Sequence, residues 1–189
     1  MKHLFFKTIV FLFLFTITSC SESDAPQDQL PPITQTGANT FGCVINGEVL
    51  IPKDGIGVPQ PKGITVKYRN NKNFIIDAGN LKDNGGGDIY IYIYNLTSTG
   101  VYNLGVSDNQ SDLSFAPSYP HIFCRTYDGA NQGKVYLSNV NSGTITITRF
   151  DSDNHIVSGT FELTVFNKDN PSETIEITEG RFDVNWSTL

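Results

Sequence analysis

From residue 39 onward, the hydrophobic pattern of the chain has a period of two. Apolar residues alternate with polar ones over short segments, and clusters of Gly, Asn, Asp and Ser separate these segments. Such alternation is typical of β-strands with one face in a core, and no stretch of ten residues has apolar positions at helical spacing. Strands are predicted over residues 41–45, 49–51, 64–68, 73–77, 88–94, 101–104, 121–127, 134–137, 144–148, 160–166, 174–178 and 182–186.

The segments between these strands carry turn signals. Asn46-Gly47 separates the first two strands and is the strongest short hairpin signal, because a type I′ turn needs positive φ at both central residues. Near the C-terminus, Ser158-Gly159 predicts a bulge or a bend, and Glu179-Gly180-Arg181 predicts either a bulge in one long strand or a tight connection. Ten to twelve short strands predict an all-β fold, either a single antiparallel β-sandwich or a partly open β-barrel. Residues 39–189 are about 150 residues, enough for one domain with its own core.

The N-terminus has a different pattern. Lys2 and Lys7 accompany an unbroken apolar run over residues 9–15. A transmembrane helix needs roughly 20 apolar residues, so this run is too short to span a bilayer, but it matches a secretory signal. Ile17-Thr18-Ser19-Cys20 resembles the bacterial lipobox, whose cysteine becomes acylated and forms the new N-terminus. We therefore predict a lipoprotein signal peptide at residues 1–19 and lipidation at Cys20; the alternative is an ordinary signal peptide with Cys20 incidental.

Residues 20–38 are polar, rich in proline and without periodicity, which predicts a lipidated cysteine followed by a flexible tether. Fully extended, the residues after Cys20 would reach roughly 60 Å. Their acidic start resembles export signals of some surface lipoproteins of Bacteroidota, although a plain linker fits equally well. Outer-membrane attachment is predicted, and both the periplasmic and the cell-surface face remain as alternatives.

The net charge limits the classes of molecule that the domain can bind. The chain has 13 Lys and Arg against 19 Asp and Glu; residues 1–19 hold two of the former and none of the latter, so their removal changes the formal net charge from −6 to −8. An acidic domain without a basic cluster is unsuited to nucleic acids or anionic headgroups. Membrane contact is therefore predicted through the lipid on Cys20.

Two further cysteines follow, Cys43 and Cys124. An even pair in an oxidising compartment predicts a disulfide. It would close a loop of about 80 residues and stabilise the fold by about 4 kcal/mol on a chain-entropy model. The alternative is two buried free thiols, a common state for cysteine.

The strand at residues 88–94 offers a candidate binding surface. Isoleucines occupy one face, and Tyr90, Tyr92 and Tyr94 occupy the other. Aromatic rings on a rigid sheet can stack on sugar rings or contact a protein partner, but they can equally pack in a second core layer. Ligand contacts are otherwise expected in the long polar segments 53–62, 80–87 and 105–119.

No catalytic constellation, metal site or cofactor site is predicted. Glu162, Glu176 and Asp183 alternate with apolar residues, which places them on an outward face rather than in a glycosidase-like pair. The segment 151–155 resembles the start of a calcium loop, but Ile156 stands where such a loop needs glycine, and a β-turn explains the same residues. The glycine-rich segment 83–88 is a second weak calcium candidate.

Several segments together resemble one family. They are residues 37–47 with Cys43-Val44-Ile45-Asn46-Gly47, residues 100–104 (Gly-Val-Tyr-Asn-Leu), and the closing segments 156–163 and 175–184. These are similar to a group of Bacteroidota outer-membrane lipoproteins that carry a domain of unknown function. The resemblance implies a lipid-anchored all-β domain and transfers no site residues. We expect a non-enzymatic binding or accessory module for a glycan or an envelope protein; the alternatives are a carbohydrate-active hydrolase and a purely structural envelope component.

Overall fold

The structure, a computed structural model, describes residues 29–82, 87–109, 117–127 and 133–189. The predicted signal peptide, Cys20, the predicted tether up to residue 28 and residues 83–86 of the glycine-rich segment lie outside these ranges. Within them, every regular element is a β-strand, and no helix occurs that could cross a membrane.

The described residues form eleven strands, which agrees with the ten to twelve that the sequence predicts. They are β1 (Thr40–Ile45), β2 (Glu48–Leu50), β3 (Ile64–Tyr68), β4 (Phe74–Gly79), β5 (Asp88–Ile93), β6 (Gly100–Asn103), β7 (His121–Thr126), β8 (Lys134–Leu137), β9 (Gly143–Asp151), β10 (Ile156–Asn167) and β11 (Thr174–Asn185).

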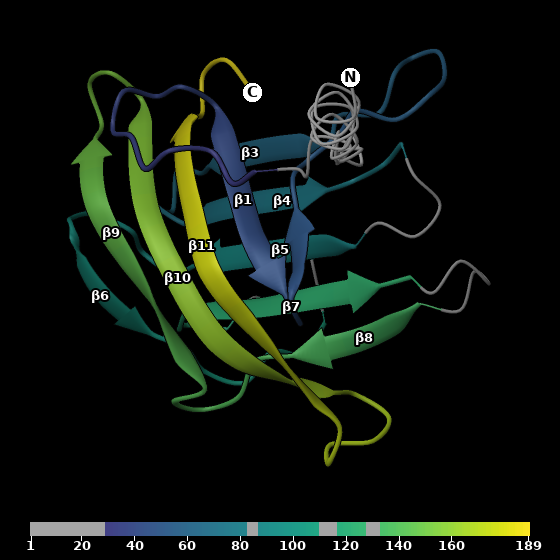
Figure 1. Cartoon of the computed structure of the whole chain (residues 1–189). Coiled ribbons are helices and arrows are strands. Elements are labelled where there is room, and N and C mark those ends of the chain that lie inside the picture. Colours follow the sequence, from purple (N-terminus) through teal and green to yellow (C-terminus); the bar gives the residue numbers. More distant parts are fainter. Residues whose placement is uncertain (1–28, 83–86, 110–116, 128–132) are drawn as a thin grey trace, which may run out of the picture.

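All eleven strands belong to one antiparallel sheet that curls into a partly open barrel (Figure 1). The main order is β2-β1-β11-β10-β8-β7-β5-β4-β3. The sheet has two halves, one with β2, β1, β11, β9 and β6 and the other with β8, β7, β5, β4 and β3. The twelve-residue β10 joins them, because most of its length pairs with β9 and its last two residues pair with β8. β9 in turn carries the short edge strand β6. The predicted all-β, partly open barrel is confirmed.

The core lies between the two halves of the sheet and follows the period of two. The three isoleucines of β5 are fully buried against residues of the opposite half. Phe41, Phe161 and Phe182 form a contiguous aromatic group, with ring centroids 5.7 Å apart for Phe41 and Phe161 and 6.4 Å apart for Phe161 and Phe182. Because alternate residues point to opposite faces of a strand, the sequence pattern alone selects these inward positions.

The closing segments form bulges in long strands. β11 pairs with both β10 and β1, and its register shifts opposite Gly42–Val44 and opposite Phe161–Leu163. Glu179 has a φ of 53°, and a Cβ on Gly180 would lie 2.5 Å from the Phe161 ring. The segment at Glu179 and Gly180 is therefore a bulge, not a connection. At Ser158-Gly159, where the sequence predicts a bulge or a bend, the register shifts between β9 and β10.

Cys43 and Cys124 are free thiols in the structure, so the predicted disulfide is not formed. Both side chains are fully buried in the main core, on β1 and β7. Burial raises the pKa of Cys43 to about 12, and it also raises the pKa of Cys124. The apolar interior favours the neutral thiol over the reactive thiolate. Two buried free thiols are the alternative to a disulfide that the sequence leaves open.

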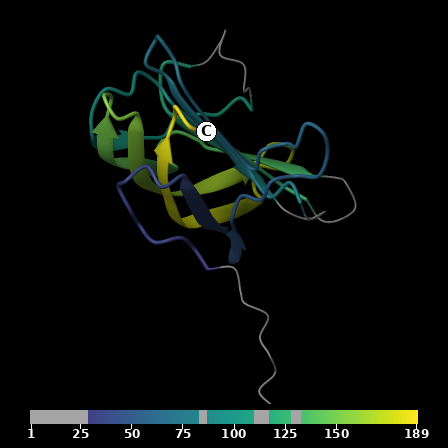
Figure 2. The ribbon, with the colours of Figure 1, turned by 90° about the horizontal axis from the view of Figure 1, so that it is seen from above.

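The chain before β1 folds back over the outside of the barrel. We call residues 30–38 the strap; in Figure 2 the strap runs outside β11 before the chain enters β1. Leu30 and Pro31 lie over Gly42, where an added Cβ would come within 2.8 Å of Pro31 Cδ. Thr34, Thr36, Gly37 and Ala38 donate hydrogen bonds to Asp183 of β11. The folded part of the chain thus begins several residues before the predicted boundary at residue 39.

Candidate functional site

A cavity of about 360 Å³ opens at one end of the barrel. We call it the mouth cavity. Its lining comes from the β1–β2 hairpin, the end of β4, the start of β5, the end of β7, β8 and β11. The lining residues are Ile45, Asn46, Glu48, Val49, Leu50, Asn80, Gly87, Thr126, Tyr127, Tyr136 and Ile175.

The cavity exists because the barrel is barely closed on this side. β2 and β3 are the two ends of the main strand order, and β2 has only three residues. Beyond β2, an isolated bridge joins Lys53 to Asn80 at the end of β4, with hydrogen bonds from Lys53 N to Gly79 O (3.1 Å) and from Leu81 N to Lys53 O (2.9 Å). The space beside this bridge is the mouth cavity. Open barrel ends are common places for ligand sites.

The mouth cavity is amphipathic. Its floor consists of Ile45, Leu50, Tyr136 and Ile175, which are all buried core residues. Its rim carries the amides of Asn46 and Asn80, the hydroxyls of Thr126 and Tyr127, and the carboxylate of Glu48. Such a combination can accept a ligand with one apolar face and several hydrogen-bonding groups.

A hydrogen-bonded carboxylate fixes the floor. Glu173 accepts hydrogen bonds from Lys134 Nζ (2.6 Å), Tyr136 Oη (2.7 Å) and Asn167 Nδ2 (2.9 Å). The bond from Lys134 contributes most to holding the pKa of Glu173 below its usual value. Burial, followed by the adjacent Glu173, raises the pKa of Tyr136 to about 12, so its hydroxyl stays a neutral donor.

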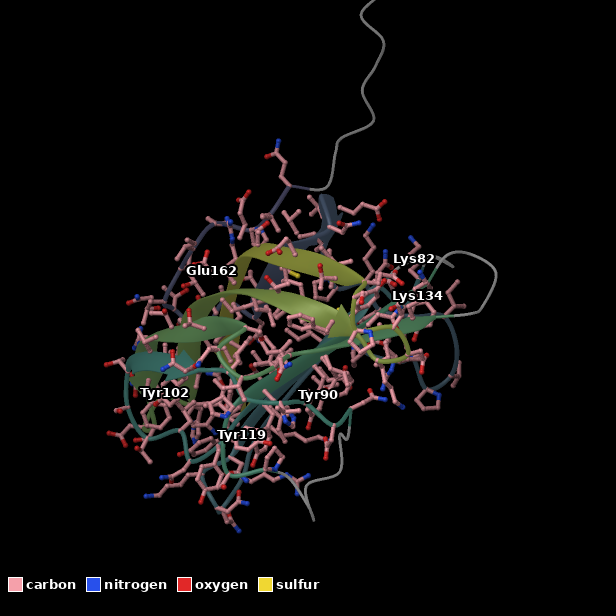
Figure 3. The ribbon with its side chains drawn as sticks, turned by 90° about the horizontal axis from the view of Figure 1, so that it is seen from below. Lys82, Tyr90, Tyr102, Tyr119, Lys134 and Glu162 are labelled. Atoms are coloured by element: carbon pink, nitrogen blue, oxygen red, sulfur yellow. The ribbon has the colours of Figure 1, made fainter. Side chains whose placement is uncertain are left out.

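The aromatic part of the rim is also held in place. Tyr127 Oη donates to Asp88 Oδ2 over 3.2 Å, and Arg125 Nη1 contacts both oxygens of Asp88, at 3.2 and 3.3 Å. Burial and the Asp88 carboxylate raise the pKa of Tyr127. With 40% of its surface exposed, the Tyr127 ring remains accessible at the entrance. Lys82 and Lys134, labelled in Figure 3, lie at this same end of the molecule.

The predicted tyrosine platform is wrong for two of its three members. Tyr90 and Tyr92 do occupy the face of β5 opposite the isoleucines, but they are only 5% and 1% exposed. They pack with Ile75 and Phe123 in a second, smaller apolar cluster, in which the rings of Tyr90 and Phe123 stack 4.8 Å apart. Tyr94 alone is exposed, at 43%. Tyr90 and Tyr92 therefore pack in a second core layer, which is the other arrangement that the sequence allows, and the three tyrosines form no flat surface for a ligand.

The three carboxylates singled out by the sequence do not converge. Glu162 and Glu176 are exposed on the outer face, as predicted. Asp183 also points outward from its sheet, yet it is only 1% exposed because the strap covers it. Glu162 lines a second, smaller groove of about 250 Å³ beside the strap, whose described lining has one other carboxylate, Glu179, which pairs with Arg181 at 3.0 Å.

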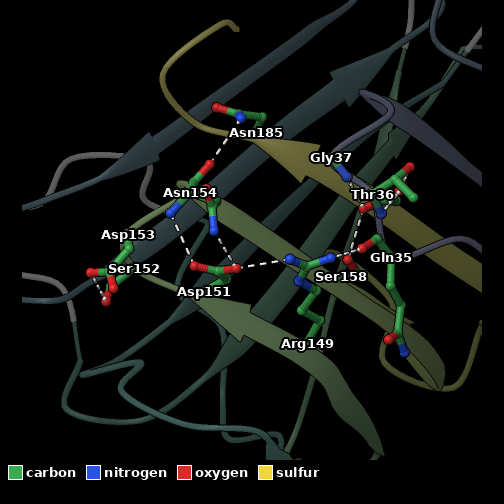
Figure 4. Close-up of polar contacts among 11 residues, drawn as sticks. Gln35, Thr36, Gly37, Arg149, Asp151, Ser152, Asp153, Asn154, Ser158 and Asn185 are labelled. Atoms are coloured by element: carbon green, nitrogen blue, oxygen red, sulfur yellow. Dashed lines mark hydrogen bonds and ion pairs between the residues drawn. The ribbon is translucent and has the colours of Figure 1, made fainter.

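The segment 151–155 is a hydrogen-bonded turn between β9 and β10 (Figure 4). Asp151 accepts hydrogen bonds from Asn154 N and Nδ2, both at 2.9 Å, and pairs with Arg149 at 2.8 Å. The bond from Arg149 is the main cause of the lowered pKa of Asp151. These contacts use the carboxylate within the turn, as in the β-turn interpretation. Across the described ranges, no group of three or more His, Cys, Asp and Glu residues could hold a metal ion.

Most of the mouth cavity was not identified by sequence reasoning. Of the three polar segments expected to bear ligand contacts, only residues 80–87 contribute, through Asn80 and Gly87. The sequence predicts the turn at Asn46-Gly47, but the position of this hairpin beside Thr126 and Tyr127 depends on long-range pairing that no local pattern encodes.

Comparison with known proteins places the chain in one family. Residues 62–184, well over half of the chain, match the family described as "Domain of unknown function (DUF6252)". The match begins just before β3 and ends within β11, so it includes six of the eleven residues that line the mouth cavity but leaves out the strap, β1 and β2. No curated protein and no solved structure matches the chain. The chain therefore belongs to the DUF6252 family, whose function is unknown.

Proposed function

We propose that this protein is a lipid-anchored module of the bacterial cell envelope that binds a glycan, without enzymatic activity, in the mouth cavity. One observation carries the proposal: the barrel end presents an amphipathic cavity with a rigid apolar floor and a polar, partly aromatic rim. A sugar ring has the matching chemistry, with apolar C–H faces and a periphery of hydroxyl groups. Its faces suit the Tyr127 ring, and its hydroxyls suit the amides and hydroxyl of Asn46, Asn80 and Thr126.

The size of the site agrees with a small ligand. Ligand pockets commonly measure about 300–1,000 Å³, and the mouth cavity lies at the low end of that range. One or two sugar units, such as the end of a longer glycan, are therefore a suitable ligand.

The lining also favours binding over hydrolysis. A glycosidase of the usual kind needs two carboxyl groups on either side of the scissile bond. Among the described residues that line the mouth cavity, Glu48 is the only carboxylate. The Glu173 carboxylate next to the floor is occupied by Lys134, Tyr136 and Asn167.

Binding is tested by screening the full chain in detergent on a glycan array and measuring the affinity of each hit by calorimetry. Val49→Trp fills the mouth cavity, and Tyr127→Ala removes the aromatic rim. Each is expected to weaken binding at least about tenfold, since aromatic contacts and filled sites dominate such affinities. Tyr94→Ala is the matched control, because Tyr94 is equally exposed but does not line the cavity. A hit whose affinity falls with Tyr94→Ala and not with the other two variants would refute the proposed site.

The lipid anchor has its own test. In cells fed a labelled palmitate analogue, the wild-type chain is expected to carry the label and to fractionate with the outer membrane. Cys20→Ala removes the thiol that would be acylated, so label and membrane association should both be lost, because two or three acyl chains are needed for stable anchoring. Label that persists in Cys20→Ala would contradict the lipobox assignment.

A further inference from the structure

Asp183 has the most extensive hydrogen bonding of any carboxylate in the described part of the chain. Its two oxygens accept six hydrogen bonds: from Thr34 Oγ1 (2.7 Å), Thr36 N (2.8 Å), Thr36 Oγ1 (3.3 Å), Gly37 N (2.8 Å), Ala38 N (3.2 Å) and Ser158 Oγ (2.8 Å). Five of the six donors belong to the strap, and only Ser158 belongs to the sheet. The residue therefore connects the strap to β11.

The Asp183 carboxylate carries a permanent negative charge in this contact. Burial alone would raise the pKa of Asp183, but the hydrogen bonds from Thr34, Thr36, Ser158 and Gly37 outweigh it and hold the pKa well below its usual range. The carboxylate is thus ionised, and hydrogen bonds to an ionised acceptor are roughly twice as strong as neutral ones.

Two arginines hold the rest of the strap. Arg149 of β9 donates through Nη1 to Gln35 O, and Arg181 of β11 donates through Nη1 to Pro31 O over 3.5 Å. Figure 4 shows Arg149 between Asp151 and Gln35, with Thr36 and Gly37 close to Ser158. The strap is therefore attached to β9 and β11 at several points along its length, and the strongest of these is Asp183.

We propose that Asp183 is an attachment residue that fixes the strap to the barrel, so that the chain leaves the folded domain at Leu30 instead of at the start of β1. This inference gains its biological meaning from the proposed lipid anchor at Cys20. With the strap attached, ten residues link Cys20 to Leu30 and span at most roughly 35 Å; with the strap released, eighteen residues to Ala38 would span roughly 60 Å. Asp183 would then hold the domain close to the membrane.

The attachment itself is tested by amide hydrogen exchange of the full chain in detergent. In the wild type, the amides of Thr36, Gly37 and Ala38 are expected to be strongly protected. In Asp183→Asn their protection should fall by about 100-fold, since the acceptor loses its charge and half of its acceptor capacity. The amides of β4 and β5 report whether the barrel itself remains folded.

Thr34→Val keeps the attachment testable if Asp183→Asn does not fold. It removes one donor outside the sheet, and protection of the same three amides should fall about tenfold. Asp153→Asn, in the exposed turn between β9 and β10, is the matched control and should change nothing at the strap. Free-peptide exchange rates for these amides in the wild type, or unchanged protection in Thr34→Val, would overturn the proposal.

The effect on reach is measured with the single tryptophan, Trp186, which lies three residues after Asp183. Energy transfer from Trp186 to an acceptor lipid is measured for the lipidated chain on supported bilayers. Asp183→Asn should lower the transfer, because the domain can then move farther from the membrane, while Asp153→Asn should not. Equal transfer in wild type and Asp183→Asn would refute the role in reach, whereas a chain that acquires no lipid in cells would refute the lipid anchor alone.

Discussion

Replacing Gly143 by alanine is expected to destabilise the domain by about 3–5 kcal/mol, one of the largest effects of any single methyl group in this chain. Gly143 begins β9 and lies opposite Leu163 of the central strand β10. A Cβ at this position would stand 2.2 Å from the Glu162 carbonyl oxygen and 2.3 Å from Leu163 Cβ. Because these atoms belong to the backbone and first side-chain carbon of β10, which pairs on both sides, they cannot move away without breaking the sheet. Urea unfolding followed by Trp186 fluorescence measures the loss.

Gly55→Ala is the matched control for this prediction. Gly55 is buried, but the nearest atoms to an added Cβ are side-chain carbons of Leu81 and Pro61 at 3.3 Å. A shift of a few tenths of an ångström accommodates the methyl group, so the change should stay within about 1 kcal/mol. Equal stability losses for the two alanine variants would show that strand β9 is not packed against β10 as described.

The stability of the domain is expected to fall as the pH is lowered from about 6.5 to about 4, through the titration of His121. This side chain is 1% exposed, and neither ring nitrogen has a hydrogen-bond partner among the described residues. Burial lowers the pKa of His121 from 6.5 to about 4, while Asp108 acts in the opposite direction. In this pH window the unfolded chain binds a proton that the folded chain does not, so stability is present above pH 6.5 and is lost as the pH decreases. The shift corresponds to about 3 kcal/mol.

His121→Phe tests this assignment. Phenylalanine retains the packing against Tyr92, whose ring centroid lies 5.0 Å from that of the histidine, but it does not titrate. The unfolding free energy of the variant should therefore depend much less on pH between 4 and 6.5 than that of the wild type. His155→Asn serves as the control: His155 is exposed and has a φ of 61°, which asparagine tolerates. A wild-type pH dependence that persists in His121→Phe would contradict the assignment to His121.

The fold class follows from the sequence because strand patterns are local. Alternation over residues 88–94 correctly places the isoleucines of β5 in the core, and Asn46-Gly47 forms the expected hairpin, with φ values of 50° and 88°. The local sequence pattern does not predict which strands pair with one another. The pairing of β1 with β11 joins Thr40 to Asp183, and nothing in either segment specifies the other.

The tyrosine face of β5 illustrates the limit of a periodic pattern. The alternating pattern predicts that Tyr90 and Tyr92 lie on the face opposite the core isoleucines, but it does not predict which residues cover that face. The answer depends on register, since β4 and β7 place Ile75 and Phe123 beside these tyrosines. The second apolar cluster is thus a property of three aligned strands and is absent from each strand alone.

The same limit explains Asp183 and the mouth cavity. Asp183 does point away from the core, as its position between Phe182 and Val184 predicts, but the strap that buries it returns from about 150 residues earlier in the chain. The composition of the strap, with its prolines and polar residues, resembles a linker and gives no sign of a fixed path. The mouth cavity likewise combines segments that are far apart in the chain, from Ile45 to Ile175, so it exists only in the folded domain.

The pairing of β1 with β11 also sets an order on folding. β11 stands between β1 and β10, so the first strand of the domain cannot join the main sheet until the last strand has been made. A chain that still lacks its C-terminus can offer β1 only the three-residue β2 as a partner, while the local β3–β4–β5 meander can already pair. Such non-local pairing makes folding slow and late. The barrel can therefore be completed only after β11 has been made, although the β3–β4–β5 meander can form earlier.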